Sequence, residues 1–582
     1  MDRYLVTTSD EKTWPLDEPL LFLGVWCKNH RRKHIWSALN VKTASPYLYD
    51  KNLPDTNIYL DVLFDELIKE IAEALNLFHG VSYSNRYWNI LLGHWLRQYL
   101  KVLIHRFRAL DGAINNNKIS GVSGYKSNPY SLVTKNRLQF VSAINNAKWN
   151  SILFSKILSQ LNDINFPVKI LALNEKVDLP PEKQNKTIKR RLIKFVSSQL
   201  NKIYRDEDAL ILKTYLSPLN EVKLHLNLFQ VPKLWQTPEL DFGELNPESR
   251  ENFKLDFSKF TGFEMLVRKL IIELLPTCYL EGYNKICSAT DAFSWPKNPK
   301  FIFTSNSFEH DEGFKFWTAK KTENGIPYFV GQHGSNYGTY KFSYNWTEIT
   351  TCDKFLSWGW NNVYTNIDTI SAFNFIASGK ENKSYDKNGF LLLIERGPGE
   401  LDGPYDRRFI HKVYQQDMLS FFDGTSNHIK EKFIVRLHHG SSKHDGEDEQ
   451  LWSNHYKNIT LNLGVDPIDD LIKKSRVLVI TYDSTSILEY LNLNIPLICF
   501  WKEPMRELLE DAVPYYELLL GAGILHNDYE SASNHINDHW DKIEDWWKSN
   551  KVQDVRKVFC NRYSRKVENP AKTLSKLLLD SL

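Results

Sequence analysis

The chain has 582 residues, which is too long for one hydrophobic core, so we expect two or three domains. Apolar residues make up 42% and charged residues 25%, as in a globular protein, and a net charge of +3 argues against a dedicated nucleic-acid binder. The six cysteines show no CxxC pair and no metal-ligand spacing, as is typical of a reducing cytoplasm. The N-terminus lacks the pattern of a signal peptide, and no apolar run reaches membrane-spanning length. We therefore expect a soluble cytoplasmic protein.

The first 170 residues are predicted to combine a few short strands with a strongly helical region, in which apolar residues recur at three- and four-residue spacing. The predicted elements are strands Tyr4–Thr7 and Leu20–Val25, helices Asn57–Leu77 and Arg86–Phe107, and strand Phe166–Leu173. The segment Asp111–Pro129 is rich in Gly, Asn and Ser and predicts a loop.

Strands and helices alternate twice in the rest of the chain. The first alternation comprises helix Glu264–Leu280, strand Phe301–Thr304, helix Gly313–Lys321, and strands Pro327–Gln332 and Lys354–Trp358. The second comprises strand Gly389–Ile394, helix Arg408–Phe422, strand Phe433–Leu437, helix Pro467–Lys474, strand Val477–Thr481, a helix to Asn492, and strand Pro496–Phe500. The polar segment Ala377–Lys387 between them predicts a linker. This pattern predicts an α/β protein with two doubly wound parallel sheets.

The domain prediction follows from the same pattern. Residues 1–376 are predicted as an α/β domain with helical insertions around 57–300, and residues 377–387 as the linker. Residues 388–540 are predicted as a second α/β domain, and residues 541–582 as helices that could cross back to the first domain. In such sheets ligands bind beyond the carboxyl ends of the strands, so the candidate site residues are sought there.

One strand end in the second half carries the pattern of a phosphate site. The run Val477–Thr481 ends in Tyr482-Asp483-Ser484-Thr485-Ser486, directly before a predicted helix. The free backbone N–H groups of a helix N-terminus stabilise phosphate. Asp483 or Ser484 can cap the helix, which leaves the other hydroxyls for phosphate oxygens, and Glu489 one turn further on can accept hydrogen bonds from a ribose. An ordinary capped strand–helix turn accounts for the same residues.

A neighbouring strand, Phe433–Leu437, ends in Arg436-Leu437-His438-His439. The planar fork of Arg436 suits phosphate, and His438 offers a further donor. The alternative is a surface ion pair for Arg436 and an incidental role for the histidines.

In the first half, the strand Tyr328–Gly331 runs into Gln332-His333-Gly334. A histidine at a strand end, beside glycines that permit close backbone approach, indicates general acid–base chemistry or the binding of an anionic donor. Glu309 and Asp311 follow a neighbouring strand and are candidates for base or nucleophile, although a solvated loop explains them equally well.

Two weaker patterns have structural explanations. Asp206-Glu207-Asp208 matches a DxD metal-binding pattern but follows a basic helix rather than a buried strand, so we expect no obligatory metal. The basic helix Lys183–Arg205 could rest on an anionic membrane surface, but a solvated basic face packed on the core is the simpler explanation.

Several segments together resemble a family of transferases of surface-polysaccharide and O-antigen biosynthesis, over residues from near Tyr4 to about Tyr563. These segments are LFLGVWC (21–27), SNRYWNILLGHWL (84–96), FKFWTAK (314–320), GQHGSNYG (331–338), DKFLSWGW (353–360), YDSTSILEYLNLNIPLICFW (482–501), GILHND (523–528) and WWKS (546–549).

The C-terminal half is also similar to teichoic-acid glycerophosphotransferases that use CDP-glycerol and to capsule transferases that use CMP-Kdo. Both groups have GT-B architecture, so the resemblance implies two Rossmann-like domains with a helical N-terminal elaboration. It implies that residues 1–376 form the acceptor-side domain and that residues 388–540 bind the nucleotide donor. It implies that His333 is a base or phosphate ligand, with Gln332 and Gly334 beside it. The donor phosphate would be held by Arg436, His438, Asp483, Ser484, Thr485 and Ser486, and the ribose by Glu489. Those groups often carry Arg-x-His-Pro, whereas this chain has His439 in place of the proline.

The sequence therefore predicts a metal-independent transferase without a cofactor. It would move a sugar or sugar-like group from a nucleotide-activated donor, CMP-, CDP- or otherwise NDP-linked, to a surface glycan or lipid-linked glycan at the cytoplasmic face of the membrane. The alternatives are a glycerol- or polyol-phosphate transferase and a non-catalytic nucleotide-binding partner in polysaccharide assembly.

Overall fold

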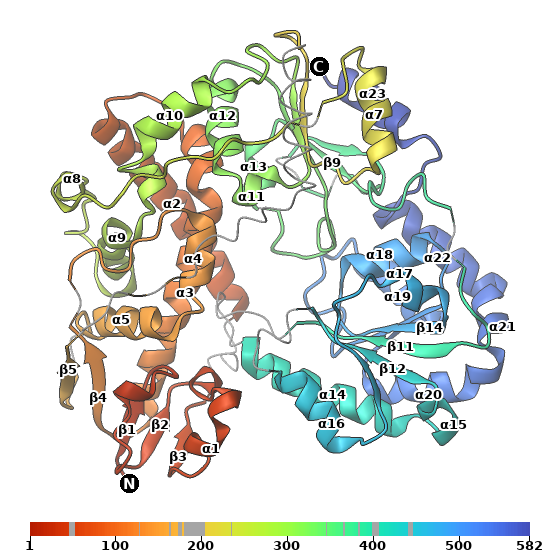
Figure 1. The fold of residues 1–582 in the computed structure, drawn as a ribbon, viewed down its shortest axis with the longest axis horizontal. Helices are drawn as coiled ribbons and strands as arrows, with labels where there is room; N and C mark the ends of the chain where they lie inside the picture. The colour runs from red at the N-terminus through yellow and green to blue at the C-terminus, as the bar shows by residue number, and fades with distance from the viewer. Residues whose placement is uncertain are drawn as a thin grey trace.

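The computed structural model describes residues 1–45, 53–126, 128–161, 164–172, 177, 179, 204–233, 235–344, 346–361, 363–364, 367–381, 384–397, 407–439 and 446–582. It contains three parallel sheets, each with helices packed against it (Figure 1). The predicted basic helix Lys183–Arg205 lies almost wholly outside the described residues. No helix in the described ranges is both long and apolar enough to cross a bilayer.

The first sheet has the order β3-β2-β1-β4-β5. Its strands are β1 Arg3–Val6, β2 Leu20–Phe22, β3 Val41–Thr43, β4 Ile119–Tyr125 and β5 Val168–Leu171. The predicted α/β class with parallel sheets is thereby confirmed. The N-terminal part, however, is not only the helical elaboration that was predicted, because it carries a parallel sheet of its own.

The predicted loop over Asp111–Pro129 is wrong, because this segment contains the end of a helix and the whole of β4. Its glycines are packing residues. A Cβ on Gly121 would come within 2.7 Å of the Tyr4 ring, and a Cβ on Gly124 within 2.4 Å of Ser155 Oγ. Glycine is therefore needed here for close approach between neighbours, rather than for a turn.

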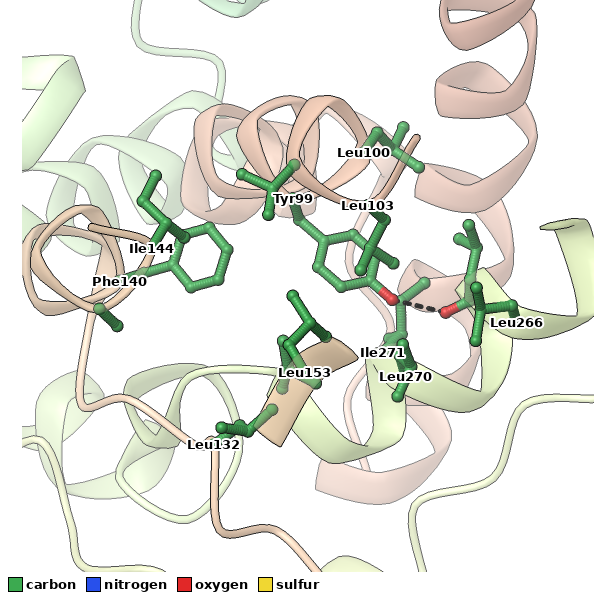
Figure 2. Close-up of a cluster of buried hydrophobic side chains, with 14 of the residues drawn as sticks. Tyr99, Leu100, Leu103, Leu132, Phe140, Ile144, Leu153, Leu266, Leu270 and Ile271 are labelled. Atoms are coloured by element: carbon green, nitrogen blue, oxygen red, sulfur yellow. Dashed lines mark hydrogen bonds between the residues drawn. The ribbon is translucent and has the colours of Figure 1, made fainter. Parts of the chain in front are cut away.

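Two long helices, α2 Leu53–His79 and α3 Asn85–Asn116, form the centre of the N-terminal core. Figure 2 shows Tyr99 and Leu103 of α3 among apolar side chains from α4 Arg137–Ala143, α5 Ala147–Leu158 and α9 Gly262–Leu274. The Tyr99 hydroxyl donates to the Val267 carbonyl at 2.6 Å, so its polar atom is satisfied within the core. Helix α3 continues past this core and packs against α12 Glu312–Glu323 beside the second sheet.

The second sheet has the order β10-β9-β8-β7-β6, and the third has the order β13-β12-β11-β14-β15-β16. The strands of the second are β6 Leu210–Leu212, β7 Ile302–Thr304, β8 Tyr328–Gly331, β9 Lys354–Ser357 and β10 Thr369–Ser371. Those of the third are β11 Phe390–Ile394, β12 Phe433–Arg436, β13 Thr460–Asn462, β14 Ser475–Ile480, β15 Leu497–Phe500 and β16 Leu525–His526. Strands such as β7, β8, β11 and β15 are almost wholly apolar and buried, as is typical of central strands in parallel sheets.

Helices of varied length connect the strands. They are α1 Lys33–Trp36, α7 Pro218–Asn227, α8 Pro247–Glu251, α10 Tyr283–Asp291, α11 Ser307–His310, α13 Thr347–Thr351, α14 Arg407–Gly424, α15 Asn427–Lys430, α16 Glu447–His455, α17 Asp469–Lys473, α18 Thr485–Asn492, α19 Val513–Gly521, α20 Tyr529–His539, α21 Ile543–Lys548, α22 Asn550–Tyr563 and α23 Pro570–Leu579.

The C-terminal segment joins the second sheet to the third. Helix α22 packs against α18 and α19, and α23 packs against α7 (Figure 1). Between α22 and α23, the buried Ser564 hydroxyl donates to the Leu488 carbonyl at 2.7 Å and accepts from Asn374 Nδ2 at 2.9 Å. Arg565 N–H donates to the Trp358 carbonyl at 2.8 Å. A further hydrogen bond, from His30 Nε2 to Gln450 Oε1 at 2.7 Å, links the first-sheet region to α16.

We predict that Ser564→Ala lowers the free energy of unfolding by about 1–3 kcal/mol, because it leaves buried polar groups of both neighbours unpaired. Chemical denaturation of the full chain measures the loss. Ser581→Ala, which removes a hydroxyl near the chain end that bonds only to the Leu577 carbonyl, is the control and should change stability by less than about 0.5 kcal/mol. Equal effects of the two substitutions would contradict the bridging role of Ser564.

Candidate active site

A cavity of about 650 Å³ lies at the carboxyl ends of the third sheet. Its walls from that sheet include Arg396 after β11, Thr481–Asp483 after β14, and Trp501 and Lys502 after β15. The opposite wall comes from Lys101 of α3, Trp346, and Asn336 in the loop after β8. The cavity is therefore bounded by strand ends of the third sheet and by parts of the N-terminal half.

A second cavity of about 320 Å³ lies at the carboxyl ends of the second sheet. It is lined by Phe308 and Glu309 after β7, by His333 and Tyr337 after β8, and by side chains of α3, α4 and α13. Lys101 and Trp346 line both cavities, so the two adjoin. Together they form one cleft between the facing edges of the second and third sheets.

The loop after β8 is held by Gln332, whose side chain is buried. Its Oε1 accepts from Trp358 N–H at 2.8 Å and from Trp360 Nε1 at 2.9 Å, and its Nε2 donates to the Gly334 carbonyl at 2.8 Å. Both polar atoms of the Gln332 side chain therefore have hydrogen-bond partners within the protein. The structure therefore gives Gln332 a role in shaping the loop that carries His333.

This loop touches the N-terminus of α18 directly. The Ser335 N–H donates to Thr485 Oγ1 at 3.1 Å, and a Cβ on Gly334 would lie only 3.0 Å from the same oxygen. The hydrogen bond spans 150 residues of sequence and joins the strand ends of two different sheets. The two predicted motifs, the QHG loop and the DSTS turn, are thus brought side by side.

Within the DSTS turn, Ser484 occupies the N-cap position of α18 in extended backbone, but its side chain makes no capping hydrogen bond. Asp483 does not cap the helix either, because its Oδ2 accepts from Tyr516 O–H at 2.8 Å. Burial raises the pKa of Asp483 to about 6, and the hydrogen bond from Tyr516 offsets only part of that rise. The N-terminus of α18 therefore follows the cavity-lining Asp483 directly and has no side-chain cap from Ser484.

Of the predicted donor-binding residues, Asp483 is the only one among the described residues that lines either cavity. Arg436 donates to Asn462 Oδ1 and to the Asp466 carbonyl, both at 2.7 Å, so its fork holds the loop after β13. Glu489 pairs with Lys380 at 3.2 Å. His438 lies against Gly397, where a Cβ would be 2.8 Å from its Nδ1. This geometry gives Arg436 and Glu489 structural partners and does not bring them to the cleft.

His333 lies in an aromatic setting on the second-sheet side of the cleft. Its ring stacks on Tyr215 with centroids 6.2 Å apart, and Phe308 lies 5.7 Å away. Burial lowers the pKa of His333 below its usual value, although the carboxylates of Glu348 and Glu309 oppose the shift. The imidazole is therefore neutral at pH 7 and can accept a proton.

The two predicted carboxylates after β7 differ in position. Glu309 lines the smaller cavity, forms an ion pair with Arg137 at 3.4 Å and lies 3.4 Å from His310 Nε2. Asp311 caps α12: its Oδ1 accepts from Phe314 N–H at 3.0 Å and its Oδ2 from the Thr237 hydroxyl at 2.6 Å. Asp311 is one residue past α11 and does not line either cavity of the cleft among the described residues, so the geometry supports Glu309 and not Asp311.

The model of the LIC12162 family transferases matches residues 3–578. The chain belongs to this family. The predicted transferase class is thereby confirmed, and no curated protein matches the sequence.

Solved structures show only distant similarity to this transferase. Anabaena Alr3699/HepE in complex with UDP and glucose is 11% identical over 51% of this chain and 82% of that chain, with a TM-score of 0.33. Acinetobacter baumannii MurG is 10% identical over 52% and 80%, with a TM-score of 0.29. A UDP-GlcNAc 2-epimerase from Neisseria meningitidis bound to UDP-GlcNAc is 13% identical over 51% and 80%, with a TM-score of 0.30. These scores are too low to support an inference about the site.

Sequence reasoning missed several residues of the transferase's cleft. His94 Nε2 donates to Glu348 Oε2 at 3.1 Å, and Tyr337 donates to Glu348 Oε1 at 2.6 Å. On the other wall, the Arg396 guanidinium lies 4.5 Å from the centre of the Tyr414 ring. His94 had a usable signal, since it is a polar residue within an otherwise apolar helical run. Glu348 had no such signal, because α13 is too short to show a helical pattern of apolar residues in the sequence.

The DxD pattern lies away from the cleft. Asp206–Asp208 precedes β6, at the amino edge of the second sheet, and Asp208 accepts a hydrogen bond from Arg205 N–H at 3.1 Å. The cleft lies at the opposite, carboxyl edge. This position agrees with a structural role for the three acidic residues.

We predict that Asp483→Asn stabilises the protein above pH 6 and that this gain disappears near pH 4. The folded-state pKa of about 6 exceeds the usual value of 3.8, so the folded wild type binds more protons between these values and loses stability as the pH rises through them. Asparagine keeps an acceptor for Tyr516 and does not titrate. Denaturation of both proteins at pH 4 and pH 8 tests this. A stability difference that is the same at both pH values would contradict the raised pKa.

Proposed function

We propose that this transferase is a metal-independent, GT-B-like glycosyltransferase that moves a sugar or sugar-like group from a nucleotide-activated donor to a hydroxyl group of a glycan. The observation that carries the proposal is the direct contact between the QHG loop and the N-terminus of α18, which follows the cavity-lining Asp483. This contact brings the turn proposed to bind phosphate next to the loop that carries the neutral His333.

The donor is proposed to bind at the third sheet. The first N–H groups of α18 and the hydroxyls of Ser484, Thr485 and Ser486 suit phosphate oxygens. Arg396 and Lys502 line the adjoining cavity of about 650 Å³ and add positive charge. That volume is within the range of small-molecule sites and suits a nucleotide. CMP-, CDP-, UDP- and GDP-linked donors are all candidates.

The acceptor is proposed to enter from the second sheet, where His333 and Glu309 line the smaller cavity. A neutral His333 would remove the proton of the attacking hydroxyl, whose oxygen then bonds to the anomeric carbon of the donor. The bond from that carbon to the donor phosphate breaks, and the phosphate leaves with the electron pair. The helix N-terminus stabilises the negative charge on the leaving group without a metal or other cofactor.

The biological acceptor is proposed to be a surface glycan of the O-antigen or capsule type, carried on a lipid at the cytoplasmic face of the membrane. This assignment rests on the sequence resemblance alone. A glycerol- or polyol-phosphate transferase would use the same phosphate site, and its product would contain a phosphodiester. A non-catalytic partner would bind nucleotide and form no product.

We predict that free nucleotides of one base stabilise the protein against heat, by roughly 2.7 kcal/mol at a concentration 100 times the Kd. Mass spectrometry with the four classes of donor and glycan acceptors should then detect a glycosidic product. His333→Ala should lower kcat by about 100-fold or more while the affinity for the nucleotide is kept. Binding without product, with wild-type behaviour of His333→Ala, would contradict the proposal.

A further inference from the structure

We propose that Tyr337 and Glu348 form a positioning relay that holds His333 with its proton on Nδ1, so that Nε2 is the atom that accepts the proton of the acceptor hydroxyl. This inference rests on the proposed function, and it assigns roles to two residues that lie behind the predicted base.

The three side chains form a continuous chain of hydrogen bonds. The Tyr337 hydroxyl lies 2.6 Å from Glu348 Oε1 and 3.2 Å from His333 Nδ1. Tyr337 and Glu348 are both nearly inaccessible to solvent, at 3% and 7% exposure. All three line the smaller cavity of the cleft, so the relay ends at the space assigned to the acceptor.

The proton positions in this chain of hydrogen bonds can be assigned because the Tyr337 hydroxyl has only one proton to donate. Glu348 is ionised: although burial opposes its charge, hydrogen bonds from His94, from Tyr337 and from a backbone N–H lower the pKa of Glu348 below its usual value. A bond of 2.6 Å to a carboxylate is stronger than one of 3.2 Å to a neutral ring nitrogen, so Tyr337 gives its proton to Glu348. The phenol oxygen then accepts from His333, which requires a hydrogen on Nδ1.

The second carboxylate oxygen of Glu348 also has a hydrogen-bond partner. Its Oε2 accepts from His94 Nε2 at 3.1 Å. His94 Nδ1 is buried without a hydrogen-bond partner among the described residues, and burial lowers the pKa of His94. A proton on that nitrogen would be buried and unsatisfied, so His94 is neutral and serves as a donor to Glu348 through Nε2. Through His94, helix α3 thus fixes the position of the Glu348 carboxylate, which orients His333.

The arrangement follows the logic of a catalytic triad, in which a buried acid fixes the tautomer of a histidine, with a tyrosine inserted between them. During the reaction, Nε2 takes the hydroxyl proton as the carbon–oxygen bond forms, and the ring becomes an imidazolium. The negative charge of Glu348 stabilises that cation through the tyrosine. Tyr337 and Glu348 are positioning residues, because in this arrangement neither contacts the reacting atoms.

The titration of His333 depends on several groups that face it or line the same cavity. They are Glu309 and His310 on α11, Glu348 on α13, Tyr337 in its own loop, Tyr215 after β6, His94, Arg97 and Lys101 on α3, and Arg137 on α4. Glu348 and Glu309 both raise the pKa of His333 against the effect of burial. Removal of the Glu348 charge should therefore lower that pKa further.

Two conservative variants test the relay, with a third as control. Tyr337→Phe and Glu348→Gln should each lower kcat by roughly 10- to 100-fold and leave the KM of the acceptor within about twofold. Glu348→Gln should also move the acid limb of the pH–rate profile to lower pH. Tyr364→Phe is the control, because the Tyr364 hydroxyl holds the same loop by accepting from Gly338 N–H at 2.8 Å without contacting His333. It should leave kcat within about threefold and the profile unchanged.

An NMR measurement, which does not require turnover, accompanies the kinetic measurements. In ¹⁵N-histidine-labelled protein, the His333 signals are assigned by their loss in His333→Asn, and their chemical shifts report which nitrogen carries the proton. We expect protonated Nδ1 in the wild type and a mixture of tautomers in Tyr337→Phe.

Protonated Nε2 in the wild type would overturn the relay. Unchanged kcat and an unchanged pH–rate profile in both relay variants of an active enzyme would also overturn it, and either result would leave the glycosyltransferase proposal intact. Failure of the wild type to turn over any donor would count against the proposed function, and the NMR result would still decide the tautomer.

Discussion

The central contact of the cleft is the hydrogen bond from the Ser335 N–H to Thr485 Oγ1. It joins the loop after β8 to the N-terminus of α18, and the backbone bonds of Thr339 and Lys341 to Leu509 and Glu507 link the same segment to the third-sheet region. The absence of a side chain on Gly334 permits this approach, and Gln332 fixes the loop from behind. The C-terminal segment supports the same contact from outside, because Ser564 bonds to groups on both sides.

Two carboxylates of this cleft have opposite net pKa shifts, although burial alone raises the pKa of both. Glu348 receives hydrogen bonds from His94 and Tyr337, so it stays charged with a pKa below its usual value. Asp483 receives one hydrogen bond from Tyr516 and its pKa rises to about 6. Hydrogen bonds, rather than burial alone, thus decide the charge. A charged carboxylate can orient the histidine, whereas Asp483 becomes largely protonated only below its pKa of about 6.

The sequence was most informative where periodicity and strand ends coincide. The central strands and the two motifs at their ends were predictable, because continuous apolar runs mark buried parallel strands. The strand β4 was not, since Gly121 and Gly124 resemble a loop until their packing against Tyr4 and Ser155 is seen. Hydrogen-bond partners that lie far apart in the chain could not be predicted from the sequence either. Nothing in the sequence links His94 to Glu348, and Arg436 has the composition of a phosphate ligand but serves a neighbouring loop.

The most direct test of the account is a crystal structure of the protein with a nucleotide that stabilises it. The account predicts phosphate oxygens within hydrogen-bonding distance of the backbone N–H groups and hydroxyls at Ser484–Ser486, with the nucleoside in the cavity beside Arg396 and Trp501. A nucleotide bound away from the N-terminus of α18, or with its phosphates on Arg436 instead, would contradict the central claim that this turn is the donor site.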